Sequence, residues 1–143
     1  MPSYEIVEGY QNMDLIAVHA FLKQSYWSPE IPFEVVRKAA ENSICFGIKV
    51  GGEQVAFARV ITDKATFAYL SDVYVLEEHR GRGLSHQIME RITQHADLQH
   101  LRRFMLVTRD AHSLYSRYGF EVASSPERIM EVLKPDLYRT EPS

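Results

Sequence analysis

The chain has 143 residues, of which 45% are hydrophobic, and its formal net charge is −3. A chain of this length can bury one core without disulfides, so we predict a single domain over residues 1–143. The acidic balance argues against a general nucleic-acid-binding protein, and the sequence has neither a run long enough to cross a membrane nor a secretory signal. With Cys45 as the single cysteine, no internal disulfide can form, and we expect a cytoplasmic protein.

Apolar residues alternate in some segments, as in strands, and recur at helical spacing in others. In chain order they predict strand 4–8, helices 13–23 and 33–41, strands 44–50, 54–61 and 67–75, helix 84–96, strand 104–107, helix 111–118, and strands 120–123 and 128–133. Successive strands with tight turns form an antiparallel meander, whereas a strand, helix, strand order requires a parallel neighbour. We therefore predict an α+β (mixed α/β) fold, with a mostly antiparallel sheet of about six to seven strands and about four helices.

Short-range signals mark the ends of several elements. Asn12 is suited to cap the first helix, and Asp110 the last one. Gly51 and Gly52 predict the turn of a hairpin. Gly119 is suited to the left-handed conformation that ends a helix.

A glycine-rich turn stands where the strand over residues 67–75 gives way to the next helix. Its sequence is Arg80-Gly81-Arg82-Gly83-Leu84-Ser85. The start of a helix offers unpaired backbone N–H groups and a partial positive charge, and glycine lets the backbone approach an anion closely. The turn can therefore hold a pyrophosphate, although a short turn of this kind also occurs as a simple helix cap.

Two blocks of the sequence, residues 73–85 and 111–120, resemble motifs of one protein family. The first is similar to the acetyl-CoA motif of the Gcn5-related N-acetyltransferases (GNAT), whose core is (Gln/Arg)-x-x-Gly-x-(Gly/Ala); Arg80 and Gly83 match, and Ser85 departs. The second resembles the family's Ala-x-x-Leu-Tyr-x-x-x-Gly-Phe block through Ala111, Leu114, Tyr115, Gly119 and Phe120. The family's order of elements also matches the predicted order, so the resemblance covers nearly the whole chain.

The resemblance implies that the chain uses acetyl-CoA as the acyl donor. Backbone groups of Val73, Tyr74 and Val75 would bind the pantetheine arm as an added strand, because that arm carries peptide-like amides. The backbone N–H groups of the glycine turn would bind the pyrophosphate, and Ser85 still admits it because serine is small and keeps its N–H. Thr108 stands where many members have an asparagine that contacts the cofactor arm. The six histidines show no metal-binding spacing, so no metal is expected.

The resemblance also implies a reaction, in which a primary amine attacks the thioester directly in a ternary complex. The departing thiolate needs a proton, and in the family this proton comes from the tyrosine that Tyr115 matches. The growing negative charge on the acyl oxygen would be stabilised by a backbone N–H at Val73 or Tyr74. The alternative for Tyr115 is that it only packs, as we expect for Tyr118.

The sequence does not identify the general base. Candidates are Asp72, Glu77, Glu78, Tyr69, Ser71 and a chain of water molecules. Regular alternation would place Asp72 on one face of its strand together with Tyr74, and Tyr69, Ser71 and Val73 on the other. A charge inside an apolar strand needs a partner or a task, and Arg59 on the adjacent strand is a possible partner for Asp72.

The sequence does not identify the residues of the acceptor pocket either. Arg59 either binds an acidic group of the substrate or neutralises Asp72, and Tyr26 and Trp27 either line the acceptor pocket or cover the core. The acceptor itself can be a small metabolite, a polyamine, an antibiotic or a protein amine. The chain can act as a monomer or as a homodimer.

Two other functions compete with acetyl transfer. The first is a non-catalytic acyl-CoA-binding sensor or interaction module, against which the tyrosine at position 115 counts. The second is a nucleoside-triphosphate site at the glycine turn, which lacks the lysine and hydroxyl pair of a P-loop.

Overall fold

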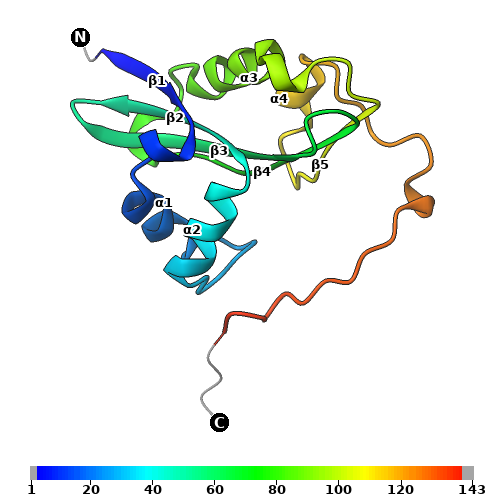
Figure 1. The fold of residues 1–143 in the computed structure, drawn as a ribbon, viewed down its shortest axis with the longest axis horizontal. Coiled ribbons are helices and arrows are strands. Elements are labelled where there is room, and N and C mark those ends of the chain that lie inside the picture. Colours follow the sequence, from blue (N-terminus) through cyan, green and yellow to red (C-terminus); the bar gives the residue numbers. More distant parts are fainter. Residues whose placement is uncertain (1–2, 140–143) are drawn as a thin grey trace.

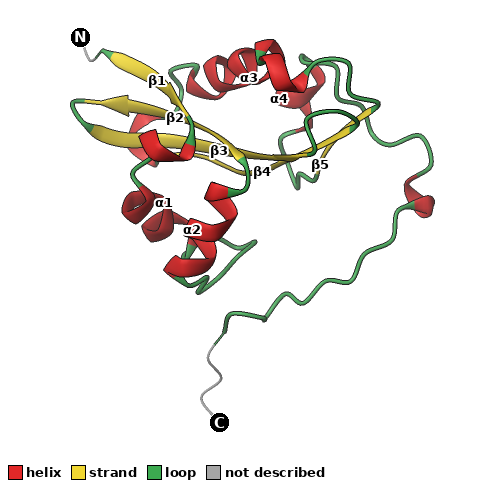
Figure 2. Ribbon diagram, in the orientation of Figure 1, coloured by secondary structure: helices red, strands yellow, loops and turns green. Residues whose placement is uncertain are grey.

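The computed structural model describes residues 3–139, and five strands form one twisted sheet with helices on both faces (Figures 1 and 2). In chain order the main elements are β1 (Tyr4–Glu8), α1 (Leu15–Leu22), α2 (Phe33–Glu41), β2 (Ile44–Val50), β3 (Glu53–Thr62), β4 (Phe67–Val75), α3 (Leu84–Gln94), β5 (Arg103–Leu106) and α4 (His112–Ser116). The strands lie in the order of their numbers, antiparallel except for the parallel pair β4 and β5. Helices α3 and α4 cover one face of the sheet, and α1 and α2 the other (Figure 2).

The mixed α/β fold is confirmed, and the predicted order of elements holds as far as α4. The sheet has five strands rather than six or seven, and within residues 3–139 neither predicted C-terminal strand, 120–123 or 128–133, forms. Their apolar pattern favours strands, but a strand forms only where a neighbour pairs with its backbone. Instead this part of the chain runs outward as an arm (Figure 1).

The first helix begins later than predicted, at Leu15. Its cap is Asp14, whose side chain accepts a hydrogen bond of 3.1 Å from the backbone N–H of Ala17. Asn12 does not cap the helix, because its side-chain amide donates to the carbonyl of Glu8 at 2.8 Å. The hairpin turn predicted at Gly51 and Gly52 is confirmed, since β2 and β3 pair on either side of it.

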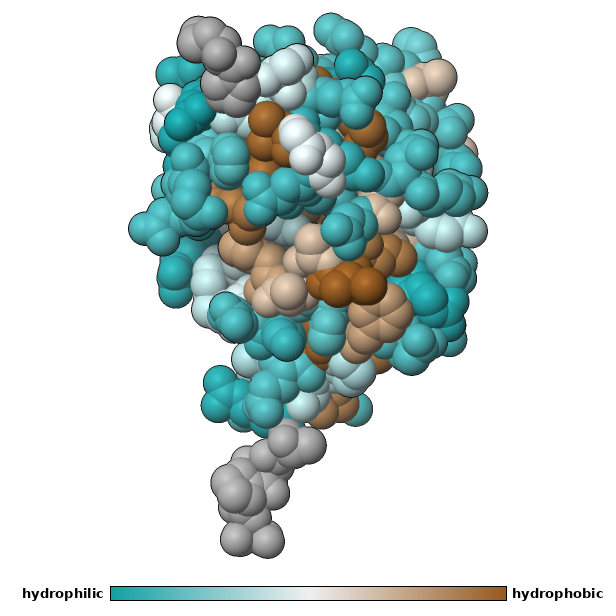
Figure 3. Space-filling model, turned by 90° about the vertical axis from the view of Figure 1, so that its left-hand side faces the viewer, coloured by the Kyte–Doolittle hydropathy of each residue, from teal (hydrophilic) through white to brown (hydrophobic). Residues whose placement is uncertain are grey.

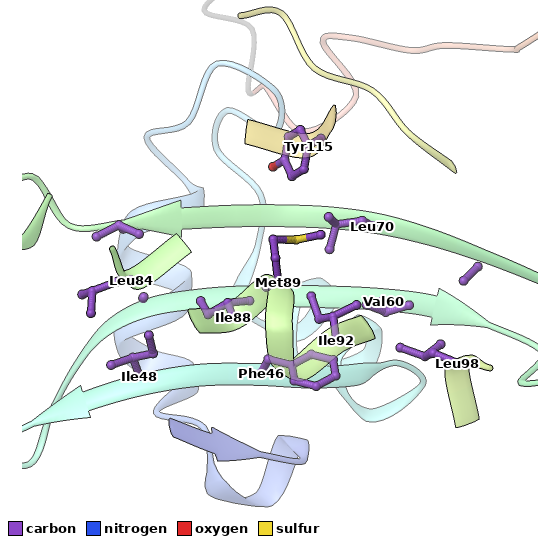
Figure 4. Close-up of a cluster of buried hydrophobic side chains, with 14 of the residues drawn as sticks. Phe46, Ile48, Val60, Leu70, Leu84, Ile88, Met89, Ile92, Leu98 and Tyr115 are labelled. Carbon is purple, nitrogen blue, oxygen red and sulfur yellow. The ribbon is translucent and has the colours of Figure 1, made fainter. Parts of the chain in front are cut away.

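The core lies on both faces of the sheet. Leu84, Ile88, Met89 and Ile92 of α3 are buried against β2, β3 and β4 (Figure 4). Burying one such side chain contributes about 1.5–3 kcal/mol, so this face fixes α3 firmly against the sheet. Since Leu84 is the first residue of α3, the same packing fixes the glycine turn that precedes it.

Candidate active site

The second half of β4 has a free edge. β4 pairs with β5 from Phe67, opposite Arg103, to Leu70, opposite Leu106. Residues 71–75 continue β4 without a partner on that side in the part of the chain that the structure describes. Free backbone N–H and C=O groups along a strand can bind an extended chain that carries amide groups.

A β-bulge interrupts β4 at Asp72. The register with β3 shifts there, and Asp72 has a left-handed backbone with φ of 57°. The alternation predicted from the sequence is therefore wrong beyond Ser71. Val73 packs with Leu70 in the cluster on the α3 face, whereas Tyr74 lies in the cluster on the opposite face.

The side chain of Asp72 is nearly buried and accepts two hydrogen bonds. Nε of Arg59 donates to Oδ2 at 2.9 Å, and Nε1 of Trp27 donates to Oδ1 at 2.9 Å. Arg59 also donates from Nη1 to Oγ of Ser43 at 3.1 Å. The ion pair suggested by the sequence is thus present and joins β3 to the bulge, while the hydrogen bond from Trp27 joins the loop after α1 to it.

Tyr26 stands beside this cluster. Its ring meets that of Trp27 edge to face, with centroids 5.1 Å apart, and the guanidinium of Arg109 lies 4.0 Å above its centroid. Tyr26 is 60% exposed, so it is free to contact a ligand. The structure thereby brings Tyr26, Trp27, Arg59 and Asp72 together on one side of the bulge.

The glycine turn forms the wall of a cavity of about 300 Å³. The cavity is lined by Val75, His79, Arg80, Gly81, Gly83, Leu84, Ser85, His86 and Leu114. Gly81 and Gly83 have φ values of 78° and 76°, a region that favours glycine. Within the described chain, the backbone N–H groups of residues 81–85 donate to no protein acceptor. The cavity therefore fits an anion.

The two arginines of the turn are held in different ways. Nε of Arg80 donates to the carbonyl of Val75 at 3.0 Å, which ties the turn to the end of β4. Nη1 of Arg82 donates to the hydroxyl of Tyr4 at 3.1 Å. Both leave guanidinium N–H groups at the turn that can meet a phosphate.

Tyr115 lies on α4, beyond β4, with its hydroxyl on the side of the ring that faces the strand (Figure 4). It is 8% exposed, and burial, with a smaller contribution from Tyr26, raises its pKa above the ordinary value. The phenol is therefore protonated at neutral pH and able to donate. Tyr115 also lines a second cavity, of about 780 Å³, beside β5.

Thr108 lines the same second cavity. Its Oγ1 accepts a hydrogen bond of 3.0 Å from the backbone N–H of Ala111, and this bond, rather than the predicted Asp110 cap, holds the start of α4. The hydroxyl proton of Thr108 stays free to donate to a ligand. Gly119, with φ of 92°, has the left-handed conformation predicted for it.

Figure 3 looks onto the side of the molecule where β4 ends and α3 begins, and it shows a band of apolar side chains framed by hydrophilic ones. A ligand with an apolar arm and a charged end suits such a surface. In residues 3–139 no His, Cys, Asp and Glu side chains form a group that could hold a metal ion. None of the helices described is long and apolar enough to span a bilayer.

The family model of the acetyltransferase (GNAT) domain matches residues 41–122. This chain belongs to the GNAT acetyltransferase family. A Gibberella zeae protein, named as a candidate acetyltransferase, is 33% identical over an alignment of 122 positions, which covers 71% of this chain and 69% of that protein.

Solved structures agree with this GNAT assignment. The crystal structure of a candidate acetyltransferase of the GNAT family from Xanthomonas campestris pv. campestris is 50% identical, covers 98% of this chain and 99% of its own, and has a TM-score of 0.93. A predicted acetyltransferase from Clostridium acetobutylicum, whose structure is described with acetyl-CoA, has a TM-score of 0.67 at 16% identity, covering 93% of this chain and 96% of that one. At that identity the Clostridium protein shows the shared fold alone.

Sequence reasoning missed three features of this GNAT site. His86 lines the cavity at the glycine turn, and no motif pointed to it. Leu114, which the second family block had matched, lines the same cavity without having been assigned to it. The third is the contact of Trp27 with Asp72, which joins residues 45 positions apart. The bulge left one local signal, an aspartate within an apolar strand, since aspartate tolerates a left-handed backbone better than most residues.

Proposed function

We propose that this protein transfers an acetyl group from acetyl-CoA to a primary amine by direct attack in a ternary complex. The observation that carries the proposal is the position of α4 between the two cavities. Leu114 lines the cavity at the glycine turn, and its neighbour Tyr115 lines the second cavity. Acetyl-CoA with its pyrophosphate at the turn and its pantetheine arm along the free edge of β4 would bring its thioester toward the Tyr115 hydroxyl.

The proposed binding uses the residues that the family motifs select. Backbone N–H groups of residues 81–85 would bind the pyrophosphate, with added charge from the guanidinium groups of Arg80 and Arg82. The backbone N–H of Arg80 is already used, since it donates to the carbonyl of Glu77 at 3.2 Å. The backbone of Val73, Tyr74 and Val75 would bind the amides of the pantetheine arm along the free edge. The free hydroxyl of Thr108 would add a donor near the arm.

The proposed chemistry needs three groups. The neutral amine nitrogen attacks the thioester carbonyl, so that a C–N bond forms and the C–S bond breaks. A backbone N–H of Val73 or Tyr74 would stabilise the charge on the acyl oxygen. Tyr115 would give its proton to the departing thiolate, which the raised pKa of the phenol supports by keeping it protonated.

Asp72 is the proposed base that receives the proton of the attacking amine, directly or through water. Its two oxygens each accept one hydrogen bond and keep a further lone pair. Tyr26 and Trp27 beside it, together with Arg59, would form the wall of the acceptor pocket. The exposed ring of Tyr26 supports contact with an acceptor at this place.

The direct test is a thiol-release assay with acetyl-CoA and a panel of amines that includes small metabolites, polyamines, aminoglycosides and peptides. We expect amine-dependent release of CoA and an acetylated product by mass spectrometry. Calorimetry with acetyl-CoA runs beside it. Tight binding without turnover on any amine would favour the acyl-CoA sensor instead, and binding of ATP but not of CoA would contradict both.

A further inference from the structure

Arg109 is a cation without a counter-ion beside the proposed reacting groups. It stands between β5 and α4, directly after Thr108, and it is exposed. Within residues 3–139 the guanidinium of Arg109 forms neither an ion pair nor a hydrogen bond. Arg59, by contrast, is neutralised by Asp72 at 2.9 Å. The positive charge of Arg109 is therefore available to a ligand.

The side chain of Arg109 is held over an aromatic ring. Its guanidinium carbon lies 4.0 Å from the centroid of Tyr26, and the attraction between a cation and the face of an aromatic ring stabilises this position. The contact joins the loop between β5 and α4 to the loop after α1, which reaches past β4 toward α4 (Figure 4). A ring covers only one face of the planar guanidinium, so the N–H groups on its edge stay free to bind a carboxylate with two parallel hydrogen bonds.

Tyr26 connects Arg109 with the groups of the proposed reaction. Burial raises the pKa of Tyr115, and the electrostatic interaction with Tyr26 adds to this effect, so the two phenols lie near each other. The ring of Tyr26 also meets that of Trp27, with centroids 5.1 Å apart, and Trp27 donates to Asp72. The free positive charge and the proposed base thus lie at the two ends of one short series of contacts.

The wall between these two ends is fixed by packed aromatic rings. The centroid of Trp27 lies 6.3 Å from that of Phe21, and Phe21 stacks on Tyr74 of β4 at 3.9 Å with the ring planes 8° apart. Tyr74 itself is buried in the sheet. A preorganised wall keeps a constant spacing between the cation and the base. An acceptor that satisfies both ends therefore carries an anionic group at a set distance from its amine.

We propose that Arg109 binds a carboxylate of the acyl acceptor, and that the acceptor is therefore a small amino acid. This inference rests on the proposed acetyl transfer and names its substrate class. The carboxylate lies against the edge of the guanidinium, and the amine of the same molecule lies between Asp72 and the thioester. One guanidinium balances the single charge of a carboxylate, but not the double charge of a phosphate. It also repels the second ammonium group of a polyamine, so Arg109 selects against that class.

The first test measures binding without acetyl transfer. Trp27 is the only tryptophan of the chain, and its ring meets Tyr26 beside the proposed carboxylate site, so its fluorescence reports a ligand there. The native protein is titrated with glycine, β-alanine and 4-aminobutanoate and with the amide of each, in the presence and absence of CoA. We expect a saturable change with at least one amino acid, and binding of its amide about ten- to a hundredfold weaker. No saturable change with any of the three amino acids would overturn the proposal.

The second test assigns the selectivity to Arg109. The ratio of kcat/KM for the amino acid to kcat/KM for its amide is measured by CoA release. We expect Arg109→Gln to lower this ratio about ten- to a hundredfold, through the amino acid alone. Arg109→Lys should restore part of it, since lysine keeps the charge but lacks the planar fork. If Arg109→Gln lowered both kcat/KM values equally, the arginine would have a structural role and the proposal would be wrong.

Arg102→Gln is the matched control for the loss of one positive charge. Arg102 is exposed, stands just before β5, and has no ion pair in the part of the chain that the structure describes. We expect this variant to keep the native ratio of the two kcat/KM values. A ratio lowered as far as in Arg109→Gln would mean that net charge, and not a bound carboxylate, sets the selectivity, which contradicts the proposal.

The outcomes separate the carboxylate site from the proposed acetyl transfer. Transfer to alkylamines, amides or polyamines as fast as to amino acids would overturn the role of Arg109 and leave acetyl transfer standing. Saturable binding of an amino acid that is lost in Arg109→Gln, without release of CoA, would support the carboxylate site and contradict acetyl transfer. Faster transfer to aminomethylphosphonate than to glycine would overturn the assignment of the anion as a carboxylate.

Discussion

At the scale of single residues, the backbone of Asp72 is the least expected feature. A left-handed conformation costs a residue with a side chain roughly 1–2 kcal/mol. Hydrogen bonds to a charged group contribute about 1.5–3 kcal/mol each, so the two bonds from Arg59 and Trp27 offset that cost. The bulge is thereby held in place within the free edge of β4, which residues 71–75 form.

Replacing Asp72 tests its proposed role as the base. Asp72→Asn keeps an acceptor for Trp27 and tolerates the left-handed backbone, but it cannot take a proton. We expect kcat to fall by about 10²–10⁴-fold. Asp63→Asn, which changes an exposed turn, is the control. If Asp72→Asn lowered only the melting temperature, the aspartate would be a structural residue.

The pH dependence of kcat follows from the raised pKa of Tyr115. A general acid works in its protonated form, so a pKa raised above its ordinary value of about 10 keeps the group active to higher pH. We expect kcat to rise with pH as the amine loses its proton and to stay level up to about pH 10. A loss of rate between pH 7 and pH 9 would show that the acid has a lowered pKa and is a different group.

Gly83 tests the anion site. A Cβ at Gly83 would meet no atom within 4 Å, so Gly83→Ala acts through its φ of 76° and not through a clash. An alanine at this φ carries a strain of about 1.4 kcal/mol, which the turn can relieve by rotating away from the conformation that binds the anion. Binding then has to restore the strained conformation, so acetyl-CoA should bind roughly tenfold more weakly. Gly51→Ala, at φ of 57° with equally open space, carries similar strain in the hairpin and should leave the affinity unchanged. Calorimetry with acetyl-CoA measures both; equal affinities in the two variants would contradict the assignment.

At the scale of the elements, local signals predicted what local interactions decide. The hairpin at Gly51, the turn at Gly81 and Gly83 and the end of α4 at Gly119 were predicted from glycine alone, since each needs a positive φ. The bulge was not, because the alternation rule assumes an unbroken pairing with β3. The two C-terminal strands, 120–123 and 128–133, were predicted from their apolar residues, but a strand also requires a neighbour that pairs with its backbone, and within residues 3–139 neither segment has one.

The start of α1 illustrates the limit of the cap signals. Asn12 and Asp14 are both good capping residues, and only the structure shows that Asp14 binds the N–H of Ala17. We expect Asp14→Ala to lower the free energy of unfolding by about 1 kcal/mol. Asn12→Ala should cost less, because its exposed amide bonds only to Glu8. Urea unfolding of both variants measures the difference, and a larger loss for Asn12→Ala would contradict the cap assignment.

At the scale of the whole molecule, the candidate site is assembled from distant parts of the chain. The loop after α1 supplies Trp27, β4 supplies the free edge, and α4 supplies Tyr115, while α3 fixes the glycine turn by its packing on the sheet (Figure 4). The motifs found two of these parts because each is contiguous in sequence. The contacts between them depend on the sheet, so the sequence could not predict the geometry of the base or the acceptor pocket.

The central claim is that Tyr115 supplies the proton to the thiolate of CoA, and Tyr115→Phe tests it most directly. Tyr118→Phe is the matched control, because it removes a hydroxyl that bonds to His86 outside the second cavity. With a good acceptor we expect kcat to fall by about 10²–10⁴-fold for Tyr115→Phe, with unchanged acetyl-CoA affinity, and to stay near the native value for Tyr118→Phe. A native kcat in Tyr115→Phe would contradict the account.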